Sequence, residues 1–134
     1  MNLITILVAI LCFGIIIMIH EAGHFFVAKK SGIRVLEFSI GMGPKIISRQ
    51  KGETKYSLRM LPIGGYCAME GEDENSDDPR AFRKAPVWKR MLVTVAGATM
   101  NLILGLILII AVTCMDSSIY STVRRMRYSR RPHL

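Results

Sequence analysis

Charged side chains are missing from two long stretches of this sequence. None occurs between Leu3 and Ile19 and none between Met91 and Met115, although 21% of all residues are charged. A helix that crosses a bilayer needs roughly 17 to 25 predominantly apolar residues, and both stretches are in this range. A soluble domain would spread its apolar residues with the period of a helix or a strand. The pattern therefore favours two membrane-spanning helices.

Other absences argue against further classes of protein. The three cysteines, Cys12, Cys67 and Cys114, form no Cys-x-x-Cys pair, so neither a disulfide framework nor a zinc knuckle is expected. No internal repeat and no glycine-rich nucleotide signature occurs. A cleaved signal peptide fits poorly, because no basic residue precedes the first stretch and no small-x-small site follows it. The net charge is +8, but the basic segments have no interspersed aromatic residues of the kind found in nucleic-acid sites, so we expect no nucleic-acid partner.

Most of the 18 Lys and Arg residues lie between the two apolar stretches. Lys29 and Lys30 follow the first stretch directly, and Lys89 and Arg90 precede the second. Because basic loops stay on the cytoplasmic side, we expect the middle segment in the cytoplasm and the N-terminus outside. The arginine-rich residues 124–131 would then lie outside, against the same rule.

The middle segment contains short alternating runs and turn signals. "IRVLEFSIG" alternates apolar and polar residues, which is typical of a strand. "KIISRQ" and "TKYSLRML" flank "KGE", where Gly52 favours a tight hairpin turn. These runs predict a small sheet of three or four strands. The acidic stretch "GEDENSDDP" predicts a solvent-exposed loop, and the basic stretch "RAFRKAPVWKR" predicts a short interfacial segment.

The expected fold class is a mainly α membrane protein, with two transmembrane helices and a small membrane-associated β-element between them. The lipid bilayer is therefore an expected partner. Five parts are predicted: a first helix in residues 1–30, a cytoplasmic-side β-element with the acidic loop in residues 31–80, an interfacial segment in residues 81–90, a second helix in residues 91–115, and a basic tail of uncertain origin in residues 116–134.

His20, Glu21 and His24 form the pattern His-Glu-x-x-His directly after the first apolar stretch. On a helix both histidines lie on one face, one turn apart, so they can bind a single Zn²⁺. Glu21 borders that face and can act as general base. The distance from Leu3 to His20 is about 26 Å at ~1.5 Å per residue, just inside the hydrocarbon layer, where ionisable residues are usually functional. If the helix ended at Ile19, the histidines would instead lie among the headgroups.

Four stretches carry a family resemblance: "HEAGHFFVAKKSGIRVLEFSIGMGPK", "YSLRMLPIGGYCAMEGE", "DPRAFRKAPVWKRMLV" and "VAGATMNLILGLI". In this order, over about residues 1–112, they resemble the site-2 protease family of intramembrane zinc metalloproteases, of the bacterial regulator of sigma-E protease type. The resemblance implies His20 and His24 as zinc ligands and Glu21 as general base. It implies that an edge strand in residues 34–69 holds an unwound substrate. Asn101 matches a polar position, where its amide contacts substrate or packs between helices.

The sequence departs from the family in its third zinc ligand. Members carry an Asp in a Leu-Asp-Gly-like motif on a later helix, and catalytic zinc uses three protein ligands. This chain has no such motif. Asp116 is predicted at the opposite membrane face. Glu37 or Glu70 could approach from the β-element, although no spacing indicates it. Ala98 replaces a proline, and residues 116–134 match nothing in the family. A truncated or frame-shifted member is the simplest hypothesis.

Three functions follow from these observations. The first is a zinc endopeptidase of the bacterial inner membrane. It would cut in or near the transmembrane segment of membrane-bound substrates, such as anti-sigma factors or precursor peptides. The second is a truncated, catalytically incomplete two-helix fragment. The third is a membrane-surface module that binds peptides or anionic lipid. The resemblance favours the first for the family, and the missing ligand favours the second for this chain acting alone.

Overall fold

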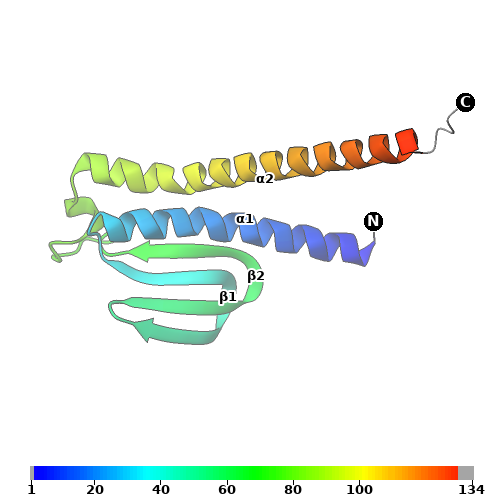
Figure 1. Ribbon diagram of the computed structural model, residues 1–134. Coiled ribbons are helices and arrows are strands. Elements are labelled where there is room, and N and C mark those ends of the chain that lie inside the picture. Colours follow the sequence, from blue (N-terminus) through cyan, green and yellow to red (C-terminus); the bar gives the residue numbers. More distant parts are fainter. Residues whose placement is uncertain (1, 130–134) are drawn as a thin grey trace, which may run out of the picture. The chain divides into compact units, whose positions relative to one another are not determined.

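The computed structural model describes the backbone of residues 2–129 and the side chains of residues 2–116 and Tyr120. The elements follow the order α1 (Leu3–Lys30), β1 (Val35–Lys51), β2 (Thr54–Met69), the short 3-10 helix η1 (Phe82–Lys84) and α2 (Val87–Ser129) (Figure 1). The chain divides into two compact units, Met1–Asn101 and Leu102–Leu134. The first unit contains the sheet and both histidines of the predicted motif.

α1 is one continuous helix that carries the His-Glu-x-x-His motif in its second half. Ser31 is its C-cap, and Lys29 and Lys30 occupy its last turn, where cations interact favourably with the helix dipole. Gly32 follows with a φ of 79°, which a residue with a side chain rarely adopts. The predicted end near residues 31–32 is therefore confirmed, and the alternative of a helix ending at Ile19 is wrong.

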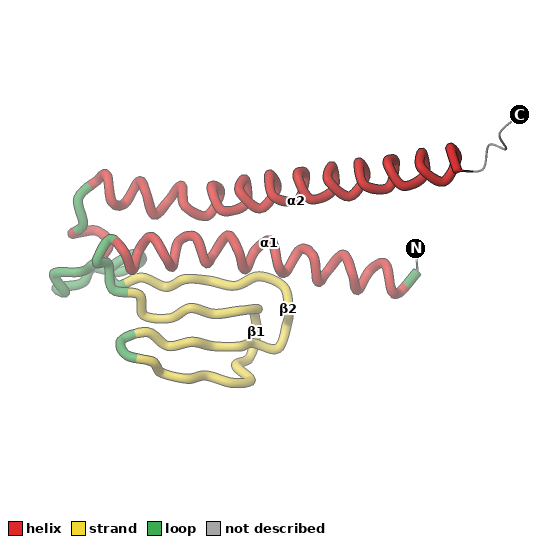
Figure 2. Tube along the Cα trace, viewed as in Figure 1, coloured by secondary structure: helices red, strands yellow, loops and turns green. Residues whose placement is uncertain are grey.

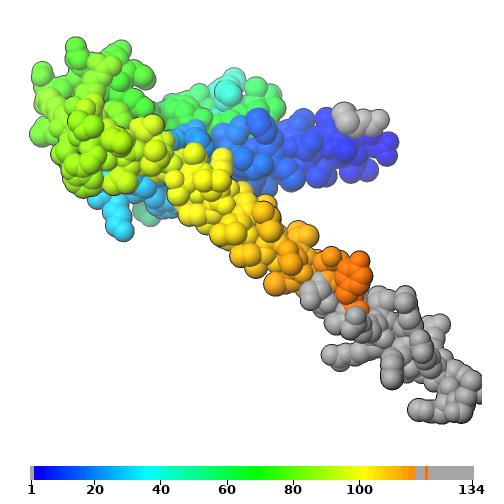
Figure 3. All heavy atoms as spheres, turned by 90° about the horizontal axis from the view of Figure 1, so that it is seen from above, coloured from blue at the N-terminus to red at the C-terminus, as the bar shows by residue number. Residues whose placement is uncertain are grey.

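By length and composition, two described helices qualify as membrane spans: Leu3–Lys30 and the segment Val87–Asp116 of α2. Their large apolar side chains lie mostly on the surface. Ile4 of α1 is 74% exposed, and Leu102 of α2 is 75% exposed. Figure 3 shows the N-terminal half of α1 (blue) at the surface of the first unit. Soluble proteins rarely expose apolar surface on this scale, whereas lipid would cover it. The expected order of helix, β-element and helix is confirmed.

The β-element consists of two long antiparallel strands, β1 and β2, rather than three or four separate ones. Both strands fold back, so that their segments lie side by side (Figure 2). Residues 37–40 pair on one side with residues 65–68 and on the other with residues 55–58, which also pair with residues 47–50. Residues 65–68 and 47–50 thus form the two outer segments.

Glycines explain why the number of strands differs from the prediction. Gly41, Gly43 and Gly64 have φ angles of 84°, 85° and 82°, in the region that side chains disfavour. They bend the strands without ending the ladder, since Met42 still pairs with Leu61 between the bends. Glycine and proline usually end a strand, yet β1 continues through residues 41–44.

The predicted hairpin turn at Gly52 is confirmed. Lys51 pairs with Thr54, which leaves a two-residue loop of Gly52 and Glu53. Gly52 has a φ of 63°, and no described residue other than glycine has a positive φ. Positive φ at the first loop position alone is the pattern of a type II′ turn, whose twist matches that of the flanking strands.

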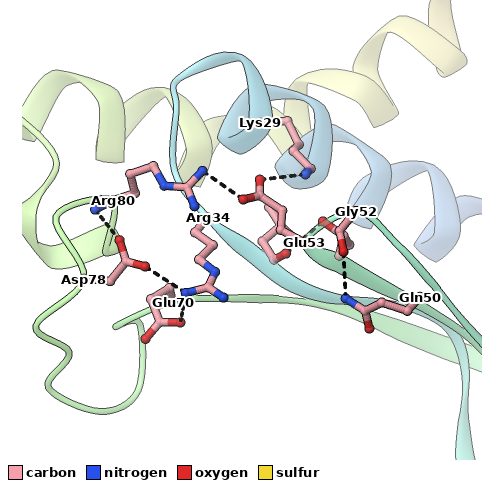
Figure 4. A network of polar contacts seen from close by, with 10 residues as sticks. Lys29, Arg34, Gln50, Gly52, Glu53, Glu70, Asp78 and Arg80 are labelled. Atoms are coloured by element: carbon pink, nitrogen blue, oxygen red, sulfur yellow. Dashed lines mark hydrogen bonds and ion pairs between the residues drawn. The ribbon is translucent and has the colours of Figure 1, made fainter.

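The buried core lies at one end of the first unit, where the end of α1 meets both ends of the β-element and the start of α2. Its buried apolar residues are Ala28, Ile33, Val35, Cys67, Met69 and Val93. Polar contacts surround the same junction (Figure 4). Glu53 of the hairpin turn forms ion pairs with Lys29 at 3.0 Å and Arg80 at 2.8 Å. These contacts tie the hairpin to the end of the motif helix.

The acidic loop is exposed at residues 73–75, 77 and 79, as predicted, while its ends are held to the rest of the fold. Asp78 pairs with Arg34 at 2.8 Å, and Glu70 accepts a hydrogen bond from the Ser76 hydroxyl. Glu72 is only partly exposed. A backbone hydrogen bond from the N–H of Phe82 to the carbonyl oxygen of Glu70 holds the two ends of the loop together. Composition predicted solvation because acidic residues are rarely buried, but basic partners from other segments hold this loop against the core.

α2 begins earlier and ends later than the predicted second helix in residues 91–115. It starts at Val87 directly after Pro86 and continues to Ser129. The prediction placed the start after the last charged residues, yet Lys89 and Arg90 lie inside the first turn. Proline just before a helix is a start signal, and here it locates the boundary better than the charges do.

Candidate metal centre

Two glycines allow α1 and α2 to approach closely at the motif. A Cβ atom on Gly23 of α1 would lie 2.6 Å from the carbonyl oxygen of Ala96. A Cβ atom on Gly97 of α2 would lie 2.5 Å from Nε2 of His20 and 2.6 Å from Nε2 of His24. Both separations are too short for real atoms. The helices therefore cross through small residues, as spanning helices commonly do.

The imidazoles of His20 and His24 converge on the space beside Gly97. Both Nε2 atoms lie beside Gly97, at 2.5 and 2.6 Å from the position that a Cβ atom of this residue would occupy. The ring centroids are 4.9 Å apart and the ring planes make an angle of 77°. Two rings that present the same nitrogen to one point are suited to share one metal ion.

A backbone carbonyl fixes the orientation of His24. Its Nδ1 atom lies 2.7 Å from the carbonyl oxygen of Val93 in α2. Because this oxygen only accepts hydrogen bonds, Nδ1 carries a hydrogen and donates it. In the neutral ring the lone pair is then on Nε2, the atom that faces Gly97. Metal-binding histidines are usually held by such a second hydrogen bond.

Asn101 of α2 contacts the other histidine. Its Nδ2 atom lies 3.3 Å from Nδ1 of His20. Its Oδ1 atom is buried and has no hydrogen-bond partner among the described residues. The sequence singled out Asn101 through the family resemblance, and the structure brings its amide to a predicted metal ligand.

A cavity of about 540 Å³ borders the motif on the side of β2. Glu21 and His24 line it from α1, residues 66–69 line it from β2, and Val93 and Thr94 line it from α2. The third predicted residue of the motif therefore faces the same space as one of the histidines. β2 runs next to Glu21 at Gly65, where a Cβ atom would lie in ordinary contact with Cγ of Glu21 at 3.6 Å.

Glu72 also lines this cavity, and the sequence did not single it out. Burial raises the pKa of its carboxyl group, and a hydrogen bond from the Met69 backbone N–H partly opposes this rise. Gly71, with a φ of 67°, turns the chain at this point. Glu72 could not be recognised from the sequence, because it lies in a strongly acidic stretch and such stretches are usually solvated.

The other acidic candidates do not join the histidines. Glu37 contacts Ser57 at 2.6 Å and Lys45 at 3.0 Å on the sheet, and Glu70 contacts Ser76 in the loop. Within the part of the chain that the structure describes, no group of three His, Cys, Asp or Glu residues could hold a metal ion. The described residues therefore bring together two nitrogen ligands and a carboxylate beside them.

The sequence model of peptidase family M50 matches residues 8–129. The chain belongs to this family. The match confirms the resemblance to the intramembrane zinc metalloproteases. It also extends beyond residue 112, where the sequence analysis ended the resemblance, and includes most of the basic segment for which no counterpart was expected.

Curated relatives of this M50 chain each carry the name putative zinc metalloprotease. The relative from Clostridium acetobutylicum is 45% identical over 126 residues, 94% of this chain and 37% of the relative. The relative from Clostridium perfringens is 50% identical over 105 residues, 78% of this chain and 31% of the relative. The chain thus spans about a third of the length of these relatives. Zinc, predicted from the motif, is confirmed as the metal of the family.

Proposed function

We propose that this chain carries the catalytic motif of an intramembrane zinc endopeptidase that hydrolyses peptide bonds in or near the transmembrane segments of membrane-bound substrates. One observation carries the proposal. His20 and His24 lie on α1, a helix apolar enough to cross a membrane, and their Nε2 atoms converge beside Gly97 of α2. Ionisable residues in such a helix are costly and usually serve function. The M50 match and the names of the relatives support the same activity.

The residues present fit a zinc ion. His20 and His24 would hold it through Nε2, and the third protein ligand would come from outside the described residues. Bound there, zinc supplies Lewis-acid activation of water and of the scissile carbonyl. The Glu21 carboxylate, in the adjoining cavity, accepts a proton from the attacking water. It then donates this proton to the nitrogen of the leaving amine.

The outer strand segment at residues 65–69 is placed to hold an extended substrate. It pairs with β1 on one side only, and residues 66–69 line the cavity that contains Glu21. A peptide that added to this edge would be held extended by main-chain hydrogen bonds, beside the general base. Strand addition requires the substrate to leave its helical conformation, which also makes its peptide bonds accessible.

We further propose that the protein is a multi-pass protein of the bacterial inner membrane with its N-terminus outside. Lys29 and Lys30 end α1, and Lys89 and Arg90 begin α2. Positive charges at these two helix ends favour a cytoplasmic location for the β-element and the catalytic cavity. The carboxylates of the acidic loop contribute little to this orientation.

A chimera would test the activity. Residues 8–129 would replace the matching part of the Clostridium acetobutylicum relative, and a single-span reporter cleaved by that relative would serve as substrate. We expect the chimera to cleave the reporter and its Glu21→Gln variant to lose this activity. An inactive chimera beside an active relative would contradict the proposal.

The 134-residue chain, expressed alone with the same reporter, separates a complete enzyme from an incomplete fragment. Since the described residues supply two ligands, we expect no cleavage by the chain alone. Cleavage that persists without the remainder of the relative, and that requires Glu21, would show that the site is completed within this chain.

A further inference from the structure

The two predicted zinc ligands differ in what faces their Nδ1 atoms. Nδ1 of His24 faces the Val93 carbonyl oxygen at 2.7 Å, which only accepts a hydrogen bond. Nδ1 of His20 faces the amide nitrogen of Asn101 at 3.3 Å, which only donates one. With the Asn101 amide in this orientation, the neutral rings would carry their hydrogens on different atoms: Nδ1 in His24 and Nε2 in His20.

Only one of these tautomers suits metal binding at Gly97. A neutral imidazole binds a metal through the nitrogen that lacks a hydrogen. Nε2 of His24 presents a lone pair to the space beside Gly97, whereas Nε2 of His20 presents a hydrogen to the same space. Because both Nε2 atoms lie there, the pair can share an ion only when His20 carries its hydrogen on Nδ1.

The orphaned oxygen of Asn101 provides for this tautomer. Oδ1 is buried and has no partner among the described residues. The two ends of an Asn amide nearly exchange places when the group turns by half a rotation. After this turn, Oδ1 faces Nδ1 of His20 and accepts its hydrogen. Either orientation leaves one end of the amide without this partner, so a metal ion at Nε2 decides between them.

We propose that Asn101 is a positioning residue for His20. In the metal-bound protein its side-chain carbonyl accepts the Nδ1 hydrogen of His20, which presents the Nε2 lone pair to zinc. This hydrogen bond also makes the imidazole a stronger ligand. The inference rests on the proposed function, since it takes His20 as a zinc ligand. It gives Asn101 a role other than the predicted substrate contact.

Three variants of the 134-residue chain in detergent test this role. Asn101→Leu removes the acceptor at similar size, and Asn101→Asp keeps an acceptor. Thr99→Val is the matched control on the same helix, because Thr99 is exposed and its hydroxyl donates a hydrogen bond to the Val95 carbonyl. Competition with a chelator gives the zinc dissociation constant, and ¹⁵N resonances of labelled histidine give the tautomer of His20. Circular dichroism checks that each variant remains helical.

We expect Asn101→Leu to weaken zinc binding about 10- to 100-fold and to reduce the Nδ1–H form of His20. Asn101→Asp and Thr99→Val should bind zinc within about threefold of the unaltered chain. The first keeps an acceptor for His20, and the second removes a contact that does not involve His20. The inference is overturned if Asn101→Leu matches the control in both measurements. It is also overturned if Asn101→Asp loses as much affinity as Asn101→Leu.

A His20→Ala variant separates this inference from the proposed function. Unchanged zinc affinity in His20→Ala would overturn the proposed function, and the role of Asn101 with it. If His20→Ala loses zinc while Asn101→Leu retains it, the ligand assignment stands and only the role of Asn101 fails.

Discussion

Gly97 is the residue whose small size the metal centre requires most directly. A Cβ atom there would overlap the Nε2 atoms of both His20 and His24. We expect Gly97→Ala to displace at least one imidazole and to reduce zinc affinity at least 10-fold. The zinc dissociation constant would be measured against Gly105→Ala, a matched control on the same helix, since a Cβ on Gly105 meets nothing within 4 Å. Equal affinity in the two variants would contradict the geometry.

Glu21 is the residue for which metal binding and catalysis should separate. Glu21→Gln keeps the size of the side chain but removes the proton acceptor. We expect reporter cleavage by the chimera to fall about 10²- to 10⁴-fold, the usual contribution of a general base, with zinc content unchanged. Metal analysis and cleavage rates on one preparation would check both. A variant with unaltered cleavage would exclude Glu21 as the base.

The residues that contribute chemistry through their own side chains could be predicted from the sequence. The spacing of His20, Glu21 and His24 predicts one helix face, and the structure has them on one helix. Other parts of the site escaped prediction. The Val93 carbonyl and the room at Gly97 depend on where α2 crosses α1, and no local periodicity encodes that crossing. Glu72 reaches the cavity through a turn in a loop whose composition indicates only solvation.

At the scale of elements, the β-element has a polar cluster that should respond to pH. Burial alone would raise the pKa of the Glu37 carboxyl, but hydrogen bonds from Ser57, Lys45 and Tyr66 outweigh this and lower it from 4.5 to about 2. Arg59 also lies 3.4 Å from this carboxylate. The charged form is thus favoured in the fold, so its stabilisation is present above pH 4.5 and is lost as the pH falls towards 2.

Glu37→Gln tests this pH dependence. We expect the variant to be less stable at neutral pH, on the order of 1.5–3 kcal/mol for hydrogen bonds to a charged group. It should also lose less stability than the unaltered chain between pH 5 and pH 2. Unfolding of the purified chain, followed through the β-sheet signal in circular dichroism, would measure both. Parallel pH profiles would show that Glu37 does not carry the effect.

Elements were predicted best where the local signal is strong. The end of α1 at Gly32 and the turn at Gly52 follow from glycine conformation and were confirmed. The number of strands was not predictable in the same way, because Gly41 and Gly64 bend a ladder that continues through them. Whether a glycine ends or bends a strand depends on pairing partners distant in the sequence.

At the scale of the whole molecule, the positive charges flanking the two apolar helices predict the topology. In a variant without native cysteines, Asn75→Cys in the acidic loop should react with a membrane-impermeant reagent only after the cytoplasmic side is opened. Asn2→Cys should react from outside. Labelling of intact cells gives both results. Reaction of Asn75→Cys in intact cells would reverse the proposed orientation.

Zinc content is the measurement that tests the central claim most directly, because the account depends on His20 and His24 sharing one metal ion. The chimera, purified without chelators, should contain about one zinc ion per chain, as expected for a mononuclear catalytic site. His20→Ala and His24→Ala should each reduce this content to about a tenth or less. Full zinc content in both variants would contradict the account.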